Sequence, residues 1–362
     1  MVQLYLKEYL KNLVGKRVCI ACREGILRDH FSEIITDIKF LARHGIKTTF
    51  FHNLPNRVAN QKLVDQMEKR LSITDLQRVD PEENFYEGVL NHPDIRDKLI
   101  FLERRYLIDT RGSKINALTT QRVRESRLEF GESIGNQNFK AVMTRLCETI
   151  EAGNCERIHI LPAGKNSIKH ELFTVEGSGT MLADNFTEEF HQVQSDDEVT
   201  LVHRILTFYK RSGYLKPRSK EYLSRNRHRF FVTVIDGIAV GCLEQKIIDE
   251  DTVELGALAI STRFRNQRVG VFTVNAFRDM MASQGYSHII SLTKNPRLQE
   301  LYGKLGFIRE SRKEHQQRQD ESPGVPMYYL NIASLKESEL NQSGRAQHTR
   351  SKDMNWRENS TR

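Results

Sequence analysis

Ser261–Phe272 read STRFRNQRVGVF, and this stretch decides how the second half of the chain is interpreted. It follows an apolar run that predicts a strand at Thr252–Ile260, and it opens a helical pattern. A strand, a basic turn and a helix can hold a phosphate, because the first N–H groups of a helix are free and its dipole is positive there. Arg265 and Arg268 add positive charge, and Gly270 lets the backbone come close to a ligand. A solvated turn that only begins the helix fits the same residues, so both interpretations stay open at this point.

The residues around this turn predict an α+β arrangement. The dipeptide Asp236-Gly237 between two apolar runs is a strong hairpin signal. Hydrophobic periodicity predicts the neighbouring elements. Strands are expected at Arg229–Ile235, Ile238–Ile247, Thr252–Ile260, His288–Leu292 and Val325–Leu330, and helices at Val199–Tyr209, after Arg268, and at Pro296–Lys304.

A second motif follows downstream: Tyr302 comes seven residues after Asn295, and Leu305-Gly306-Phe307 comes next. Together with the hairpin and Arg265-x-x-Arg268-x-Gly270, this order resembles the GNAT acetyltransferases over about residues 199–334. That family has a glycine where this chain has Arg268, and an alanine where it has Leu298. A guanidinium group at Arg268 either crowds the turn or pairs with a phosphate, and charge favours the pairing.

The resemblance implies acetyl-CoA as the cofactor. Main-chain amides of the turn would hold its pyrophosphate, and the preceding strand would pair with its pantetheine arm. The cofactor-binding residues implied in this way are Leu258, Ala259, Ile260, Arg265, Asn266, Gln267, Arg268, Val269, Gly270, Val271 and Asn295.

Acetyl transfer to an amine requires two proton transfers. The amine must lose a proton, and the departing thiolate leaves more readily when it gains one. Tyr302 matches the tyrosine that protonates the thiol in the family. Glu254, on the predicted central strand, is the candidate base, directly or through a water, and Glu244 on the preceding strand is the alternative. A core tyrosine and outward-facing strand carboxylates are the competing structural interpretations.

The first half carries a separate resemblance. Arg157–Leu182 contains ELFT followed by GSGTM, and it is similar to a segment of N-acetylglutamate synthases and arginine-sensitive N-acetylglutamate kinases. YLKEYLKNLVGKRVCI at Tyr5–Ile20 resembles the beginning of the same proteins, and Ser195–Leu223 resembles the beginning of the acetyltransferase half of the synthase. The three matches, in this order, resemble the bacterial-type N-acetylglutamate synthases, in which an amino-acid-kinase-like domain is fused to a GNAT domain.

The expected fold class is α/β. We predict a shortened amino-acid-kinase-like α/β domain at residues 1–185, and a GNAT domain with a mixed central sheet at residues 195–335. The polar segment at residues 337–362 is predicted to be disordered. Residues 56–136 are too weakly patterned for any prediction.

The first domain is predicted to be non-catalytic. An active amino-acid kinase needs glycine-rich loops for ATP phosphates, whereas the predicted strand ends here read Cys22-Arg-Glu-Gly25 and His52-Asn-Leu-Pro55. The resemblance implies that this domain assembles a homo-oligomer and binds L-arginine as an effector. Tyr9, Glu171 and Gly177 are the implied arginine-site residues; a strand-and-turn edge without a ligand is the alternative.

Arg218 and Ser334 are the candidate substrate-binding residues, since a glutamate substrate needs fixed partners for its carboxylates. Where the synthases carry an arginine on the last strand, however, this chain has Ile332. Three functions therefore stay open. They are an acetyltransferase acting on L-glutamate in arginine biosynthesis, a GNAT enzyme with another amine acceptor, and a non-catalytic regulator that binds acetyl-CoA or arginine.

Composition and motif content limit the partners and the compartment that we expect for the protein. The 362 residues carry 55 Lys and Arg against 47 Asp and Glu, a net charge of +8, spread along the chain without a nucleic-acid-binding motif. No window approaches the roughly 20 apolar residues of a membrane span, and the N-terminus does not read as a secretory signal. Five cysteines without framework spacing favour reduced thiols, and Cys19 and Cys22 are predicted to be core residues rather than a metal site. We expect a cytoplasmic protein with no metal, no membrane partner and no nucleic-acid partner.

Overall fold

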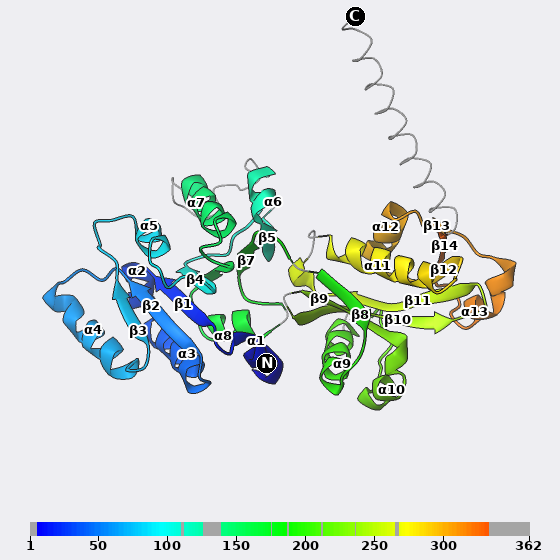
Figure 1. Cartoon of the computed structure of the whole chain (residues 1–362), viewed down its shortest axis with the longest axis horizontal. Coiled ribbons are helices and arrows are strands. Elements are labelled where there is room, and N and C mark those ends of the chain that lie inside the picture. The colour runs from blue at the N-terminus through cyan, green and yellow to red at the C-terminus, as the bar shows by residue number, and fades with distance from the viewer. Residues whose placement is uncertain are drawn as a thin grey trace, which may run out of the picture. The chain divides into compact units, whose positions relative to one another are not determined.

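The computed structural model describes residues 6–109, 112–125, 139–174, 176–186, 188–210, 213–235, 237–264 and 268–332. The chain divides into two units that are discontinuous in sequence (Figure 1). The first comprises Met1–Thr187 together with Ile235–Ile238 and Ser261–Gln267, and the second comprises Glu188–Val234, Ala239–Ile260 and Arg268–Arg362. Several predictions fall outside the described residues, namely those for Arg265, Asn266, Gln267, Ser334 and residues 337–362.

The first unit is built on a sheet whose seven described strands have the order β3-β2-β1-β4-β6-β7-β5. Neighbouring strands from β3 to β6 pair in parallel, β7 is antiparallel to β6, and β5 is parallel to β7. The strand bounds are β1 (Arg17–Cys22), β2 (Lys47–His52), β3 (Asp75–Arg78), β4 (Lys98–Glu103), β5 (Ala117–Thr119), β6 (Arg157–Pro162) and β7 (Thr180–Ala183).

Helices cover both faces of this sheet, because its central strands are apolar on both sides. Val18 and Ile20 of β1 face one core, whereas Cys19 and Ala21 face the other. The first core is closed by α1 (Leu6–Leu13), α2 (Glu24–Asp29), α3 (Phe31–Arg43), α4 (Val58–Arg70) and α8 (Ser167–Phe173). The second is closed by α5 (Phe85–Leu90), α6 (Thr120–Glu125) and α7 (Phe139–Glu151).

The described part of residues 56–136, which is too weakly patterned for prediction, contains α4, β3, α5, β4, β5 and α6. Helix α4 buries only Asn60 and Met67, so its apolar stripe is faint. Strand β3 has only four residues. The predicted α/β class of this unit is confirmed, and Cys19 and Cys22 are buried core residues on β1 as expected.

The second unit contains a mixed sheet with the strand order β13-β14-β12-β11-β10-β9-β8. β11 and β12 pair in parallel, whereas β10–β11, β12–β14 and β13–β14 pair antiparallel. The strand bounds are β8 (Glu188–Gln192), β9 (Phe230–Ile235), β10 (Ile238–Ile247), β11 (Thr252–Ile260), β12 (His288–Leu292), β13 (Ile308–Arg309) and β14 (Met327–Asn331).

Helices lie on both faces of this second sheet. Figure 1 shows α11 (Val269–Ser283) and α12 (Pro296–Lys304) over one face, and α9 (Asp196–Lys210) and α10 (Lys220–Arg225) over the other. The core beneath α11 and α12 contains Leu255, Phe277 and Tyr302, and α13 (Gln316–Asp320) precedes β14. The observed strands and helices agree with the predicted ones to within a few residues. The predicted α+β class with a mixed sheet is therefore confirmed.

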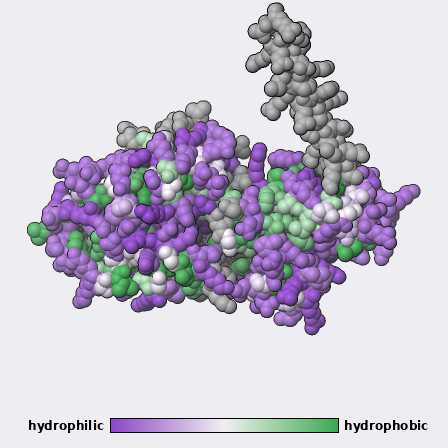
Figure 2. Space-filling view, in the orientation of Figure 1, coloured by the Kyte–Doolittle hydropathy of each residue, from purple (hydrophilic) through white to green (hydrophobic). Residues whose placement is uncertain are grey.

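The described surface is mostly polar. In the view of Figure 2, hydrophilic residues dominate and the hydrophobic ones form small patches. Among the described helices, none has both the length and the apolar character needed to cross a membrane.

His52, at the end of β2, makes the first unit sensitive to acid. It is 5% exposed, and its Nδ1 accepts a hydrogen bond from the Leu54 N–H at 3.3 Å. Burial lowers the pKa of His52 to about 4, and the charge of Arg78 acts in the same direction. As the pH falls below about 6.5, the unfolded chain therefore binds this proton before the folded chain does, and the free energy of unfolding decreases until the pH reaches about 4.

We expect this group alone to remove up to about 3 kcal/mol of stability across that pH window, and none above it. His52→Gln should flatten the acid-dependent fall in melting temperature, measured by circular dichroism from pH 7.5 to pH 4.5. His44→Gln is the matched control, because His44 is an exposed residue that follows α3. Equal acid sensitivity of wild type and His52→Gln would contradict the prediction.

Candidate active site

The parallel strands β11 and β12 diverge in the middle of the second sheet. Their ladder pairs Thr252–Glu254 with His288–Ile290. β11 continues to Ile260, and in the described part of the chain no pairing with β12 is found beyond Glu254. On the side of β11 where β12 has left, the backbone from Leu255 to Ile260 can therefore form strand-like hydrogen bonds with an extended ligand that carries amide groups of its own.

A bulge interrupts β11 within this edge. Cys242 pairs with Ala259 and Glu244 pairs with Gly256, so Ala257 and Leu258 together lie opposite Leu243. Ala257 has a φ of 50°, in the left-handed region that a residue with a Cβ rarely adopts. Bulges leave a backbone group without its ladder partner and are over-represented beside active sites. Leu258 and Ala259, two of the predicted cofactor-binding residues, lie at this bulge.

Helix α11 begins directly after the basic turn. Its N-cap is Arg268, with a φ of 61° and no side-chain hydrogen bond to the helix. The left-handed backbone explains the glycine that the family carries here, and Arg268 keeps this conformation with its side chain exposed. Gly270 lies against α12, since a Cβ at that position would be 3.3 Å from Leu301 Cδ2. The start of α11 therefore presents N–H groups without a side-chain cap beside an exposed guanidinium, which fits an anionic ligand.

Asn295 has a local structural role. It is the N-cap of α12, and its side chain accepts a hydrogen bond from the Arg297 N–H at 3.1 Å. This cap fixes where α12 begins and so places Tyr302; the predicted cofactor contact of Asn295 stays a prediction.

Tyr302 lies on α12 and is 1% exposed. Its hydroxyl oxygen is 3.0 Å from Ser291 Oγ, which donates to the carbonyl oxygen of Leu255 at 2.8 Å. The ring packs against Phe307 and Tyr328. Burial raises the pKa of Tyr302 far above its ordinary value. The proton therefore stays on the hydroxyl near neutral pH, close to Leu255, the first residue past the β11–β12 ladder.

Glu244 of β10 is fully buried. Its carboxylate binds Arg218, which precedes α10, and Tyr222, which lies in α10. Arg218 donates to Oε2 from Nη2 at 2.7 Å and from Nε at 3.2 Å. The Tyr222 hydroxyl donates to Oε1 at 2.7 Å. Arg218, predicted to bind a substrate carboxylate, thus already holds a carboxylate of the chain itself.

Glu254 of β11 is 3% exposed and is also paired. Arg318 donates to both of its oxygens, at 2.8 Å from Nη2 to Oε1, and Lys246 Nζ lies 3.2 Å from Oε1. Burial alone would raise the pKa of Glu254, but the hydrogen bond from Arg318 and the charge of Lys246 outweigh it and lower the pKa.

These contacts weigh against the expected base role, which stays a prediction. A carboxylate with a lowered pKa and both oxygens occupied is a poor acceptor for the proton of an ammonium group. The geometry therefore favours a structural ion pair at Glu254, and the paired Glu244 is no better as the alternative. The sequence missed Lys246, Tyr222 and Arg318, because nothing in the polar stretch around Arg318 distinguishes it from its charged neighbours.

On this face of β10 and β11, three cationic and two anionic side chains form what we call the charged cluster. Register places Lys246 opposite Glu254, and Glu244 opposite Gly256. With Arg218 and Arg318, the two carboxylates would leave one positive charge, but Glu321, 3.5 Å from Arg318 Nη1, balances it.

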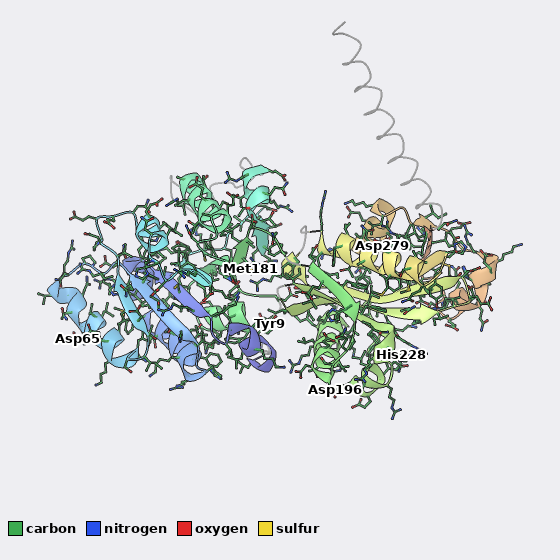
Figure 3. All side chains as sticks on the ribbon, in the orientation of Figure 1. Tyr9, Asp65, Met181, Asp196, His228 and Asp279 are labelled. Carbon is green, nitrogen blue, oxygen red and sulfur yellow. The ribbon has the colours of Figure 1, made fainter. Side chains whose placement is uncertain are left out.

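In the first unit, Glu171 and Gly177 lie close to each other: a Cβ at Gly177 would be 2.7 Å from Glu171 Oε2. Tyr9 lies on α1 (Figure 3), is 6% exposed and packs in the core shared with α8. The Glu171 carboxylate is occupied by a side chain of the same chain, Arg263.

Residues 192–307 match the family model described as "Acetyltransferase (GNAT) family". This range contains the diverging strands, the bulge, the start of α11 and Tyr302. The second unit carries a GNAT acetyltransferase domain. The sequence-based resemblance of this half of the chain is thereby confirmed.

Relatives extend the match beyond this domain. The amino-acid acetyltransferase of Pseudomonas fluorescens (strain SBW25) is 27% identical over 207 residues, which cover 57% of this chain and 46% of the relative. The protein of the same name from Vibrio cholerae is 24% identical over 208 residues, covering 54% of this chain and 46% of the relative. The chain spans about half the length of the curated relatives it matches.

A solved structure shares the fold along most of the chain. It is N-acetylglutamate synthase from Neisseria gonorrhoeae complexed with coenzyme A and L-arginine, with a TM-score of 0.50 and 15% identity. The match covers 90% of this chain and 98% of that one. The chain is therefore similar in fold to this synthase, and in sequence to proteins named amino-acid acetyltransferase.

Proposed function

We propose that this protein is an acetyl-CoA-dependent N-acetyltransferase that acts on the amino group of an amino acid. The observation that carries the proposal is the buried Tyr302 hydroxyl, which lies within a GNAT domain beside the part of β11 that has parted from β12. The names of the sequence relatives support an amino acid as the acceptor.

The described residues fit the cofactor. Backbone groups from Leu255 to Ile260 suit the amides of a pantetheine arm, and the start of α11 from Arg268 to Val271 suits a pyrophosphate. When bound there, acetyl-CoA would supply an acetyl group activated as a thioester. The exposed Arg268 guanidinium would add a charge-assisted contact to phosphate.

Tyr302 would act as the general acid. As the new C–N bond forms and the C–S bond breaks, its hydroxyl would donate a proton to the departing sulfur, and it would regain a proton from solvent. Glu254 and Glu244 are both engaged in ion pairs, so we propose that the amine loses its proton to solvent before it attacks.

Turnover should therefore increase from pH 7 toward pH 9.

We propose L-glutamate as the acceptor. The resemblance of three sequence segments to the N-acetylglutamate synthases supports this acceptor. A role in arginine biosynthesis would follow from this substrate. The second candidate is an enzyme with another amine acceptor, which the buried Ile332, 2% exposed, favours because it cannot pair with a carboxylate.

We also propose that residues 1–185 form a non-catalytic domain and that residues 195–335 carry the transferase. At the ends of β1 and β4, Arg23 pairs with the buried Glu103. This ion pair takes the place of an open phosphate loop. Homo-oligomerisation and a cytoplasmic location stay predictions.

The test is release of CoA thiol from acetyl-CoA by the full chain at pH 8, with L-glutamate, L-aspartate, L-alanine or spermidine as acceptor. We expect the highest rate with L-glutamate, and acetylated glutamate identified by mass spectrometry. A higher rate with spermidine would replace the proposed acceptor. No release with any acceptor, together with measurable acetyl-CoA binding, would favour a non-catalytic regulator.

A further inference from the structure

The connection between β13 and β14 contains a short helical segment. It consists of η3 (Lys313–His315) followed directly by α13 (Gln316–Asp320). Arg318 of α13 donates hydrogen bonds to both oxygens of Glu254. These bonds hold the segment against β11, at the residue directly before the part of β11 that has parted from β12.

The segment lies on the face of the second sheet opposite Tyr302. Side chains alternate along a strand, so Glu254 and Leu255 point to opposite faces. Leu255 packs in one core with Tyr302, whereas Glu254 shares its face with Ile290 of β12 through the parallel register. Because the two strands diverge beyond Glu254, groups on both faces can approach a ligand that lies along β11.

The inner side of the segment is polar. Between Lys313 and Ser322, the residues that are not exposed have the spacing i, i+3, i+4 and i+7, which places them on one face of a helix. They are His315, Arg318, Gln319 and Ser322. A helix that only covers a core presents an apolar stripe on this side. The polar stripe therefore calls for a different explanation.

Two atoms of this stripe are buried without a hydrogen bond. His315 is 4% exposed, and within the described part of the chain neither its Nδ1 nor Gln319 Oε1 has a hydrogen-bond partner. The other two members bond to each other, since Arg318 Nη1 donates to Ser322 Oγ at 3.1 Å. A buried polar atom without a partner costs free energy, and native structures contain few of them. The two atoms thus point to a ligand that supplies their partners.

Both atoms can accept hydrogen bonds. An amide oxygen only accepts, and Nδ1 of a neutral histidine accepts when Nε2 carries the ring proton. His315 and Gln319 are four residues apart, so their side chains are neighbours on one helical face. A single group with two N–H bonds can donate to both. A neutral primary amine is such a group, and it keeps its lone pair free.

We propose that His315 and Gln319 bind the amino group of the substrate that receives the acetyl group. This inference rests on the proposed function, because it adds to that site the residues that hold the amine. Each side chain would accept one N–H of the neutral amine and leave the nitrogen lone pair free to attack the thioester carbon. The two residues would select a primary amine, and Arg318 would act as a positioning residue that keeps α13 against Glu254.

The experiment compares wild type with Gln319→Leu, His315→Leu and His315→Asn, all as full chains. In both leucine variants the KM for the amine substrate should rise roughly tenfold, while the calorimetric affinity for acetyl-CoA stays within about twofold of wild type. In His315→Asn the amide oxygen can take the place of Nδ1, so most of the loss should be recovered. Leucine removes a buried atom that has no partner, so the melting temperature of the leucine variants without ligand should equal or exceed that of wild type.

A matched control and a second substrate sharpen the comparison. Gln317→Leu makes the same substitution at an exposed position of α13 and should behave as wild type. The N-methyl derivative of the best substrate is a secondary amine with one N–H in its neutral form. Wild type should therefore prefer the primary amine, and Gln319→Leu should show a several-fold smaller preference.

Failure of this inference can be distinguished from failure of the proposed function. If no amine releases CoA thiol, the proposed function fails, and the inference is tested by calorimetric titration of CoA-loaded wild type and variants with L-glutamate and with spermidine. Wild type should then bind one of these amines, and both leucine variants should bind it roughly tenfold more weakly.

Three results would overturn the inference. The first is an amine KM, or an amine affinity where there is no turnover, that is the same in both leucine variants as in wild type. The second is a CoA-loaded wild type that neither turns over nor binds any of these amines. The third is loss of folding in both leucine variants, or a lower melting temperature together with weaker acetyl-CoA binding, because His315 and Gln319 would then be packing residues.

Discussion

Tyr302→Phe is expected to lower kcat at least about 100-fold while changing the affinity for acetyl-CoA by less than about twofold. Proton donation by a positioned side chain contributes roughly 10²–10⁴ in rate, and this substitution removes only the hydroxyl. The ring of Tyr302 packs between Phe307 and Tyr328, and phenylalanine preserves that packing. Ser291 keeps its hydrogen bond to the Leu255 carbonyl group, so no buried donor loses all of its partners.

Steady-state kinetics with acetyl-CoA and the best acceptor, together with calorimetric binding, would measure the two quantities. Tyr328→Phe is the matched control, because Tyr328 is a buried tyrosine whose ring centroid lies 5.6 Å from that of Tyr302. It should retain most of the wild-type turnover. If Tyr302→Phe turned over within about threefold of wild type, Tyr302 would not be the general acid.

Arg218→Met is expected to decrease the free energy of unfolding by about 3–5 kcal/mol, the usual cost of breaking a buried ion pair by removing one partner. Glu244 has its side chain 0% exposed, and among the described residues the Tyr222 hydroxyl is the hydrogen-bond partner that its carboxylate would keep without Arg218. Desolvation of the carboxylate, rather than the lost attraction by itself, causes most of this effect.

The double variant Arg218→Met/Glu244→Gln distinguishes the two causes. It buries no charge at this site, so most of the lost stability should return. Urea denaturation followed by circular dichroism would measure all three proteins, with Lys220→Met as the control because Lys220 is exposed at the first position of α10. If the double variant were less stable than Arg218→Met, the stability lost in Arg218→Met would not come from an unpaired charge at Glu244.

Elements with strong local signals could be predicted from the sequence. The helix at Pro296–Lys304 has Asn295 as its cap and a proline at its first position, and the structure has the same bounds. Helix α3 is followed by Gly45 with a φ of 75°, as the predicted glycine cap requires. In these cases the residues that determine the element are adjacent in sequence.

The ionic partners could not be predicted. Glu254 and Arg318 are 64 residues apart, and Glu171 and Arg263 are 92 apart. Sequence patterns report periodicity along one element, whereas the choice of a charge partner depends on how elements pack in space. The sequence therefore offers no sign that Glu254 pairs with Arg318 or that Glu171 pairs with Arg263.

The separation of Glu171 from Arg263 has a consequence for synthesis of the chain. A ribosome adding about 5–20 residues per second takes about 5–18 s to make the 92 residues between them. During that interval a nascent first unit holds the Glu171 carboxylate, and the Gly177 turn that will surround Arg263, without the guanidinium that completes them. Final closure of the N-terminal half must therefore wait until β9, β10 and β11 have been translated, and a stall before Arg263 would leave that half exposed to proteases and chaperones.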